Sequence, residues 1–134
     1  MFVYGSLRRG NERSMLDRFP NSKFIGEAGV NGSLYDLGEY SGLVSDDSNS
    51  RVVGEVYEVD EELLNQLDEF EATSNYLRKQ VKISIGTERM TGWVYEPDPE
   101  YHSPLTLIAS GDWIEYAGRK IDALGNTKSD DTQS

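Results

Sequence analysis

Residues 59–78 read VDEELLNQLDEFEATSNYLR, and they carry the clearest helix signal in the chain. Asp60 is a favourable N-cap residue, because its carboxylate can accept a hydrogen bond from a backbone amide of the first turn. Glu61 and Glu62 follow in that turn, where the positive end of the helix dipole stabilises acids. The pattern predicts a helix that begins directly after Asp60.

One face of this predicted helix is apolar and also carries an acid. Leu63, Leu67 and Glu71 are spaced four residues apart, with Leu64 and Phe70 close by on the helical wheel. Residues at this spacing lie on one side of a helix, so the face that buries the leucines also holds the Glu71 carboxylate. The other acids fall on different faces and are expected to be solvated: Asp60, Glu61, Glu62, Asp68 and Glu69.

Two interpretations of Glu71 are open. In the first, the helix ends near Phe70, and Glu71 turns outward or forms a structural ion pair with Arg78. In the second, Glu71 is shielded from water, its pKa is raised towards neutrality, and it can take up and return a proton. The spacing of the residues is compatible with both.

The composition narrows the possible chemistry. The chain has 134 residues, which is enough for one domain with a substantial core. It contains no cysteine, so it offers no disulfide, thiolate nucleophile or zinc–thiolate site. His102 is the single histidine and lies in a proline-rich stretch, so neither a Ser-His-Asp triad nor a histidine-based metal site is expected. We interpret His102 as a surface loop residue without a role.

The charge narrows the possible partners. The formal net charge is −11, from 24 acids and 13 bases. Such a chain is repelled by nucleic acid and by anionic membranes, so neither is an expected partner. The first residues show no basic segment and no long apolar run, so we expect no signal peptide, no spanning segment and a cytoplasmic location. Nothing in the sequence predicts an oligomeric state.

The chain opens with a short strand that ends at a glycine. Residues 2–4 are apolar, and Gly5, Ser6 and Leu7 follow them. Backbone amides beyond the end of a strand have no obligatory partner, and glycine lets a ligand approach the backbone closely. Gly5 and Ser6 therefore form either a cradle for an anion or an ordinary turn. The segment is neither a Walker loop nor a dinucleotide fingerprint.

Short elements fill the rest of the chain. Asn31-Gly32 separates two strand-like segments, residues 23–30 and 33–37, and predicts a hairpin, because Asn-Gly favours the tight turns that join antiparallel strands. The other expected elements are a helix at 11–19, a brief strand within 38–44, a polar loop at 46–50, strands at 51–59, 76–85 and 89–95, a loop at 98–104, and one helical turn within 110–116.

Together these elements predict an α+β domain built on a small mixed, mostly antiparallel β-barrel, with one main helix and short helices. Such a barrel has a pocket at one end, which the Gly5-Ser6 segment and Glu71 can both face. The domain is expected to cover residues 1–120. Residues 121–134 are expected to form a polar, flexible C-terminal tail.

Four groups of residues follow one another along the chain: FVYGSL at 2–7 with Arg9-Gly10, GEVYEVD at 54–60, LDEFE at 67–71 with Tyr76 and Arg78, and GDW at 111–113. Each group is common, but the ordered set is specific. It resembles the γ-glutamylcyclotransferase-like family, most closely its γ-glutamylamine cyclotransferase branch. The chain departs from the pattern at Ser41, where relatives often have proline.

The resemblance implies an enzyme that needs no metal and no cofactor and acts on γ-glutamyl amines or peptides. In this family the α-amine of the substrate attacks the γ-amide, which releases 5-oxoproline and the free amine. The site residues that it implies are Glu71 as the catalytic acid/base, and Tyr4, Gly5, Ser6, Leu7 and Tyr76 as substrate-binding residues. One carboxylate with a raised pKa can serve both proton transfers of such a reaction.

Two alternatives stay open. One is a non-catalytic module that binds γ-glutamyl groups or other small carboxylates; the presence of Glu71 argues against it, because a binder of anions gains little from a buried acid nearby. The other is an enzyme that removes a γ-glutamyl protecting group from a larger product. The depth of the pocket distinguishes the two enzyme hypotheses, one with a free γ-glutamyl amine or peptide as the substrate and one with a larger protected product.

The acids are dispersed along the chain, a pattern found in proteins adapted to high salt and also in ordinary acidic proteins. If the acidity is a salt adaptation, the melting temperature should rise steeply from low to molar potassium chloride, because screening relieves the repulsion between like charges. Thermal denaturation monitored by circular dichroism measures this. A melting temperature that stays flat over that range would identify an ordinary acidic protein.

Overall fold

The computed structural model describes residues 1–5, 7–8, 14–38, 40–103 and 106–123. The described elements are, in chain order, β1 (Phe2–Val3), α1 (Met15–Arg18), β2 (Lys23–Asp36), β3 (Ser41–Ser45), β4 (Arg51–Glu58), α2 (Glu61–Ala72), β5 (Tyr76–Ile85), β6 (Glu88–Pro97), β7 (Thr106–Leu107) and α3 (Trp113–Ala123). None of the helices in these residues is long and apolar enough to cross a bilayer.

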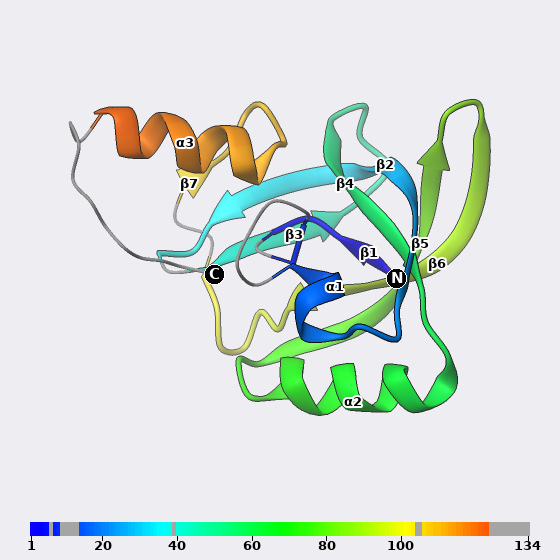
Figure 1. The fold of residues 1–134 in the computed structure, drawn as a ribbon. Helices are drawn as coiled ribbons and strands as arrows, with labels where there is room; N and C mark the ends of the chain where they lie inside the picture. Colours follow the sequence, from blue (N-terminus) through cyan, green and yellow to red (C-terminus); the bar gives the residue numbers. More distant parts are fainter. Residues whose placement is uncertain (6, 9–13, 39, 104–105, 124–134) are drawn as a thin grey trace.

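The strands form one sheet that curls into a half-barrel (Figure 1). The order across the sheet is β1-β4-β2-β5-β6, and β3 and β7 pair with β2. Every pairing among the described strands is antiparallel, as expected for strands joined by short loops. In Figure 1, α2 lies below the sheet and α3 lies beside β7. The predicted α+β class with a small, mostly antiparallel barrel is confirmed in the form of a half-barrel.

β2 is one strand of 14 residues and not the two strands of a hairpin. Its first part pairs with β4 as far as Asn31 opposite Arg51, and its second part pairs with β3 from Gly32 opposite Ser45. Gly32 has a φ of 153°, and a side chain there would collide with the carbonyl of Val44. The hairpin predicted at Asn31-Gly32 is therefore wrong: the glycine lets the strand change partners without reversing direction.

The chain reverses later, between β2 and β3. The amide of Leu37 donates to the carbonyl of Tyr40 over 2.9 Å, and the amide of Gly38 donates to the carboxylate of Asp36 over 2.8 Å. Gly38 has a φ of 107°, which a glycine adopts without strain. This turn places Tyr40 and Ser41 at the start of β3.

The helix α2 agrees with its prediction. Asp60 is the N-cap, and its carboxylate accepts a hydrogen bond from the amide of Leu63 over 2.8 Å. Leu63 and Leu67 are buried, and burying a leucine side chain contributes about 1.5–3 kcal/mol to stability. The helix continues to Ala72, so Glu71 lies within its last turn and on the same side as the two leucines.

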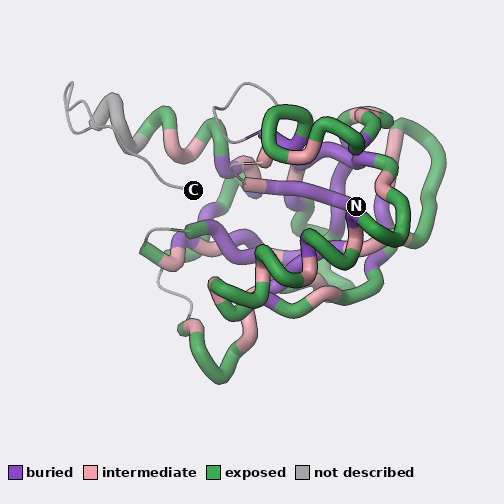
Figure 2. Tube along the Cα trace, turned by 60° about the horizontal axis from the view of Figure 1, so that its bottom comes forward, coloured by how far each residue is buried: buried purple, intermediate pink, exposed green. Residues whose placement is uncertain are grey.

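Two apolar clusters join the helices to the sheet. The first fills the curl of the sheet and includes Leu34, Val52 and Ile83 together with Trp113 of α3. The second lies between the sheet and the helices α1 and α2, and includes Met15, Tyr57, Leu63, Leu67 and Tyr95. In Figure 2 the buried stretches gather in the middle of the molecule, and the outer sides of the helices are exposed. The second cluster therefore fixes α2 across the sheet.

The two shorter helices differ from their predictions. The helix predicted at residues 11–19 is α1, of four residues, which is N-capped by Ser14; residues 11–13 lie outside the described part of the chain. The single turn predicted within residues 110–116 is α3, an 11-residue helix. Its first residue, Trp113, is buried in the core, and that contact stabilises a helix that Gly118 disfavours locally.

α3 extends past residue 120, where the domain was expected to end. Residues 124–134 lie outside the described part, so the division into a domain and a tail stays a prediction.

Replacing Gly32 with alanine should destabilise the protein by about 2 kcal/mol or more, because the new methyl group meets the Val44 carbonyl and the φ is unfavourable. Gly118→Ala is the matched control: nothing lies within 4 Å of the added carbon, so the helix should gain about 0.5–1 kcal/mol. Urea unfolding measures both. Equal effects at the two positions would contradict the role assigned to Gly32.

Candidate active site

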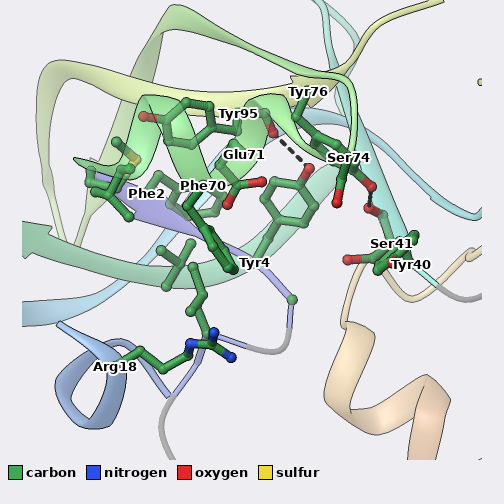
Figure 3. Close-up of a pocket in the computed structure, with 15 residues that line it drawn as sticks. Phe2, Tyr4, Arg18, Tyr40, Ser41, Phe70, Glu71, Ser74, Tyr76 and Tyr95 are labelled. Atoms are coloured by element: carbon green, nitrogen blue, oxygen red, sulfur yellow. Dashed lines mark hydrogen bonds between the residues drawn. The ribbon is translucent and has the colours of Figure 1, made fainter. Parts of the chain in front are cut away.

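A cavity of about 290 Å³ lies where α2 crosses the sheet. Figure 3 shows it between Glu71 and Phe70 of α2, Tyr4 after β1, and Tyr76 and Tyr95 of the sheet. The remaining lining residues are Met1, Phe2, Val3, Gly5, Leu7, Arg18, Tyr40, Ser41, Leu67 and Ser74. Elements far apart in the sequence therefore build one pocket.

In the described residues, no three His, Asp or Glu side chains are grouped so that they could hold a metal ion.

Glu71 lines this cavity as an acid that pairs with none of the described residues. Burial raises the pKa of its carboxyl group from 4.5 to about 7. Arg78 forms its ion pair with Asp68, 3.0 Å from its carboxylate, and lies over the ring of Trp93. The alternative in which Arg78 neutralises Glu71 is therefore wrong, and Asp68, expected to be solvated, is the acid that is paired. Of the described residues, none forms an ion pair or hydrogen bond with the Glu71 side chain.

Three tyrosines form the polar wall around Glu71, and each hydroxyl is already used as a donor. Tyr4 donates to the backbone carbonyl of Tyr95 over 2.7 Å, Tyr76 to the carbonyl of Ser41 over 2.5 Å, and Tyr95 to the carboxylate of Asp68 over 2.6 Å. Burial raises the pKa of all three phenols above the ordinary value, so they stay protonated. The tyrosines thus give the pocket a fixed shape and keep one protonation state near neutral pH.

The segment after β1 reaches the same cavity. β1 ends at Val3, and Gly5 and Leu7 both line the pocket. Gly5 lies so close to β3 that a side chain there would meet the hydroxyl of Ser41 at 2.5 Å, so a larger residue would displace the wall. No hydrogen bond between described residues uses the Gly5 amide, whereas its carbonyl accepts from Arg8. Ser6, the other predicted cradle residue, lies outside the described residues.

Arg8 ties this segment to two distant elements. Its guanidinium lies 2.9 Å from the carboxylate of Asp112, before α3, and 3.8 Å from that of Glu55, in β4. Glu55 is buried and also accepts a hydrogen bond from the hydroxyl of Tyr57 over 2.9 Å. Buried charges are stable only when they are paired in this way. The network therefore links the end of the FVYGSL group to the GEVYEVD and GDW groups in space.

Several residues at the site were not predicted from the sequence. Arg18, Tyr40 and Tyr95 line the pocket, but no local pattern around them distinguishes them from surface or core residues. His102 was predicted to be a surface loop residue without a role; it lies in a loop, but it is half-buried and makes structural contacts. Its ring nitrogen Nε2 lies 2.8 Å from the carbonyl of Ser74, and its ring packs edge-on against Tyr76 at 5.3 Å between centroids.

The comparisons with known proteins agree with this arrangement. The family model described as "Gamma-glutamyl cyclotransferase, AIG2-like" matches residues 1–115. The chain belongs to this family. The γ-glutamylcyclotransferase family protein YtfP of Escherichia coli (strain K12) is 36% identical over 121 residues, which cover 86% of this chain and 96% of that protein.

Two solved structures of proteins similar to this γ-glutamylcyclotransferase-family chain share its fold. YkqA from Bacillus subtilis matches with a TM-score of 0.73 and 30% identity over 94% of this chain, which spans 42% of YkqA. An AIG2-like protein from Mus musculus matches with a TM-score of 0.67 and 29% identity, over 84% of this chain and 86% of the mouse chain.

The raised pKa of Glu71 predicts a pH-dependent cost to stability. From pH 4.5 to 7 the folded protein keeps the Glu71 proton more tightly than the unfolded chain, so the free energy of unfolding should fall as the pH rises through this window. Glu71→Gln removes that fall and should be more stable than the parent above pH 7, by about 2 kcal/mol after allowance for partial exposure.

Urea unfolding of the parent and the variant at pH values from 5 to 8 measures this difference. Glu69→Gln is the control, because Glu69 is exposed on the same helix and its replacement should leave the pH dependence unchanged. A constant difference between the parent and Glu71→Gln across this range would show that the Glu71 pKa is not raised.

Proposed function

We propose that this protein is a γ-glutamylcyclotransferase that acts on γ-glutamyl amines or peptides, with Glu71 as the general acid/base. The observation that carries the proposal is the carboxyl group of Glu71, which pairs with none of the described residues and has a pKa raised to about 7, in a cavity lined by residues between Met1 and Tyr95. A pKa near neutrality suits a group that must accept and donate a proton in one turnover. Membership of the family supports the same reaction.

In the proposed reaction the α-ammonium group of the substrate first loses a proton to the Glu71 carboxylate. The freed amine attacks the γ-carbonyl carbon, and the new C–N bond closes a five-membered ring. Glu71 then returns the proton to the departing nitrogen, whose bond to the γ-carbon breaks. The ring nitrogen, which became cationic on attack, gives up its second proton, and the departing amine takes up that proton through Glu71. The products are 5-oxoproline and the amine as its ammonium ion, so atoms and protons balance without a co-reactant.

The pocket walls supply positioning for this reaction. The glutamyl chain must fold so that its amine meets its own γ-carbon, and a rigid pocket favours that conformation. The fixed hydroxyls of Tyr4 and Tyr76 shape the wall. The amide of Gly5, which donates to no acceptor among the described residues, suits a carboxylate or a developing oxyanion. Leu7 and the predicted contribution of Ser6 complete the substrate-binding set of the proposal.

The size of the cavity favours a free metabolite as the substrate. At about 290 Å³ it lies at the small end of ligand pockets, which supports γ-glutamyl amines and dipeptides over a protecting group on a larger product. The γ-glutamylamine branch remains part of the proposal. The binding-module alternative is disfavoured by Glu71, since a neutral side chain would hold an anionic ligand at a lower cost in stability.

Incubation with a panel of γ-glutamyl amines and dipeptides, with 5-oxoproline as the readout, tests the proposed activity. Glu71→Gln keeps the shape of the side chain but cannot shuttle the proton, so turnover of any processed substrate should fall by about 10²- to 10⁴-fold. Binding of the same substrate, measured by calorimetry, should persist.

Glu69→Gln is again the matched control and should lose little activity, because that side chain is exposed and outside the cavity. Release of 5-oxoproline by Glu71→Gln at nearly the parental rate would show that another group moves the proton. Ligand binding without 5-oxoproline from any member of the panel would support the binding module.

A further inference from the structure

The wall of the cavity contains a buried serine whose hydroxyl group is not used by the fold. Ser41, the first residue of β3, lines the cavity and is 6% exposed. Its backbone carbonyl accepts the hydrogen bond from the hydroxyl of Tyr76, but its own hydroxyl forms no hydrogen bond with any of the described residues. A buried hydroxyl without a partner costs free energy, so a ligand in the cavity is the expected partner of this group.

The hydroxyl of Ser41 lies beside the backbone amide of Gly5. Its oxygen is 2.5 Å from the position that a Cβ atom on Gly5 would occupy. That position is about 2.5 Å from the Gly5 nitrogen in standard backbone geometry, so the oxygen and the nitrogen are at most about 5 Å apart. The Gly5 amide donates to no acceptor among the described residues. Two neighbouring donors at the wall of one cavity suit an anionic group.

The α-carboxylate of the proposed substrate is the anionic group that fits this end of the cavity. Figure 3 shows the ring of Tyr4 between Glu71 and Ser41. The attacking amine must lie beside Glu71, and an oxyanion would form on the carbon that this amine attacks. The carboxylate is attached instead to the α-carbon, which takes no part in bond formation. It can therefore extend past Tyr4 to the two donors.

We propose that Ser41 is a specificity-determining residue whose hydroxyl donates a hydrogen bond to the α-carboxylate of the γ-glutamyl group, next to the amide of Gly5. This inference rests on the proposed function. Ser41 stands where relatives often have proline, and proline can donate a hydrogen bond from neither its ring nor its nitrogen. The contact is therefore a property of the pocket wall of this chain. A ligand without the carboxylate would leave the hydroxyl unpaired and would bind less tightly.

Two ligands that differ only in this carboxylate test the inference. 5-Oxoproline and 2-pyrrolidinone are the same lactam ring with and without it, and NMR titration of the full chain measures the binding of both. The parent should bind 5-oxoproline more tightly. Ser41→Ala removes one oxygen atom and should weaken the binding of 5-oxoproline by about 5- to 50-fold, the loss of one hydrogen bond to a charged group. The affinity for 2-pyrrolidinone should stay within about twofold of the parental value.

Kinetics with a γ-glutamyl substrate that the parent processes add a second measurement. The loss in Ser41→Ala should lie in KM with little change in kcat, because the carboxylate keeps its charge throughout the reaction. Ser84→Ala is the matched control: Ser84 is a half-buried serine in β5, outside the cavity, and its replacement should leave the binding of both ligands unchanged.

The outcomes separate this inference from the function on which it rests. Equal losses for both ligands in Ser41→Ala would overturn the inference, because the hydroxyl would then contact the ring or support the fold. No loss for either ligand, or a parent that does not bind 5-oxoproline more tightly than 2-pyrrolidinone, would also overturn it. The proposed function stands in each of these cases if the parent releases 5-oxoproline, whereas a parent that releases none from any γ-glutamyl substrate contradicts the function itself.

Discussion

The continuity of β2 through Gly32 is the constraint on which the pocket depends. One strand pairs with β4 along its first part and with β3 along its second part, so the sheet must curl where the partners change. This curl brings the start of β3 against the segment that follows β1, where Gly5 meets Ser41. It also gives α2 a concave surface to cross. A hairpin at Gly32 would have separated these elements, and no common cavity would have formed.

The raised pKa of Glu71 depends on which partners the neighbouring charged residues take. Asp68, one turn earlier on α2, takes both the guanidinium of Arg78 and the hydroxyl of Tyr95. Glu71 is left with burial as the cause of its raised pKa. An unpaired acid in such a place lowers stability. The proposed function gives this cost a reason, because a paired carboxylate would have too low a pKa to exchange protons near neutral pH.

The family motifs serve mainly to hold the pocket in place. Arg8 reaches Glu55 and Asp112, two acids that lie about 50 and 100 residues further along the chain. This network holds the C-terminal end of the segment that contains Gly5. The hydroxyl of Tyr57 donates a hydrogen bond to the buried carboxylate of Glu55. Three of the four motifs are thus linked by one network of charges, because Arg8 directly follows FVYGSL, Glu55 belongs to GEVYEVD and Asp112 belongs to GDW.

The sequence by itself determined the helix α2, with its cap at Asp60, and the strands that become β4, β5 and β6. Capping and alternation are interactions between residues within a few positions of each other, so they can be read locally. Only the tertiary structure decided that Gly32 bends a strand, that Arg78 pairs with Asp68, and that Arg18 lies at the cavity rim. Desolvation and the choice of an ionic partner depend on residues that folding brings together from distant parts of the chain, and local patterns do not contain that information.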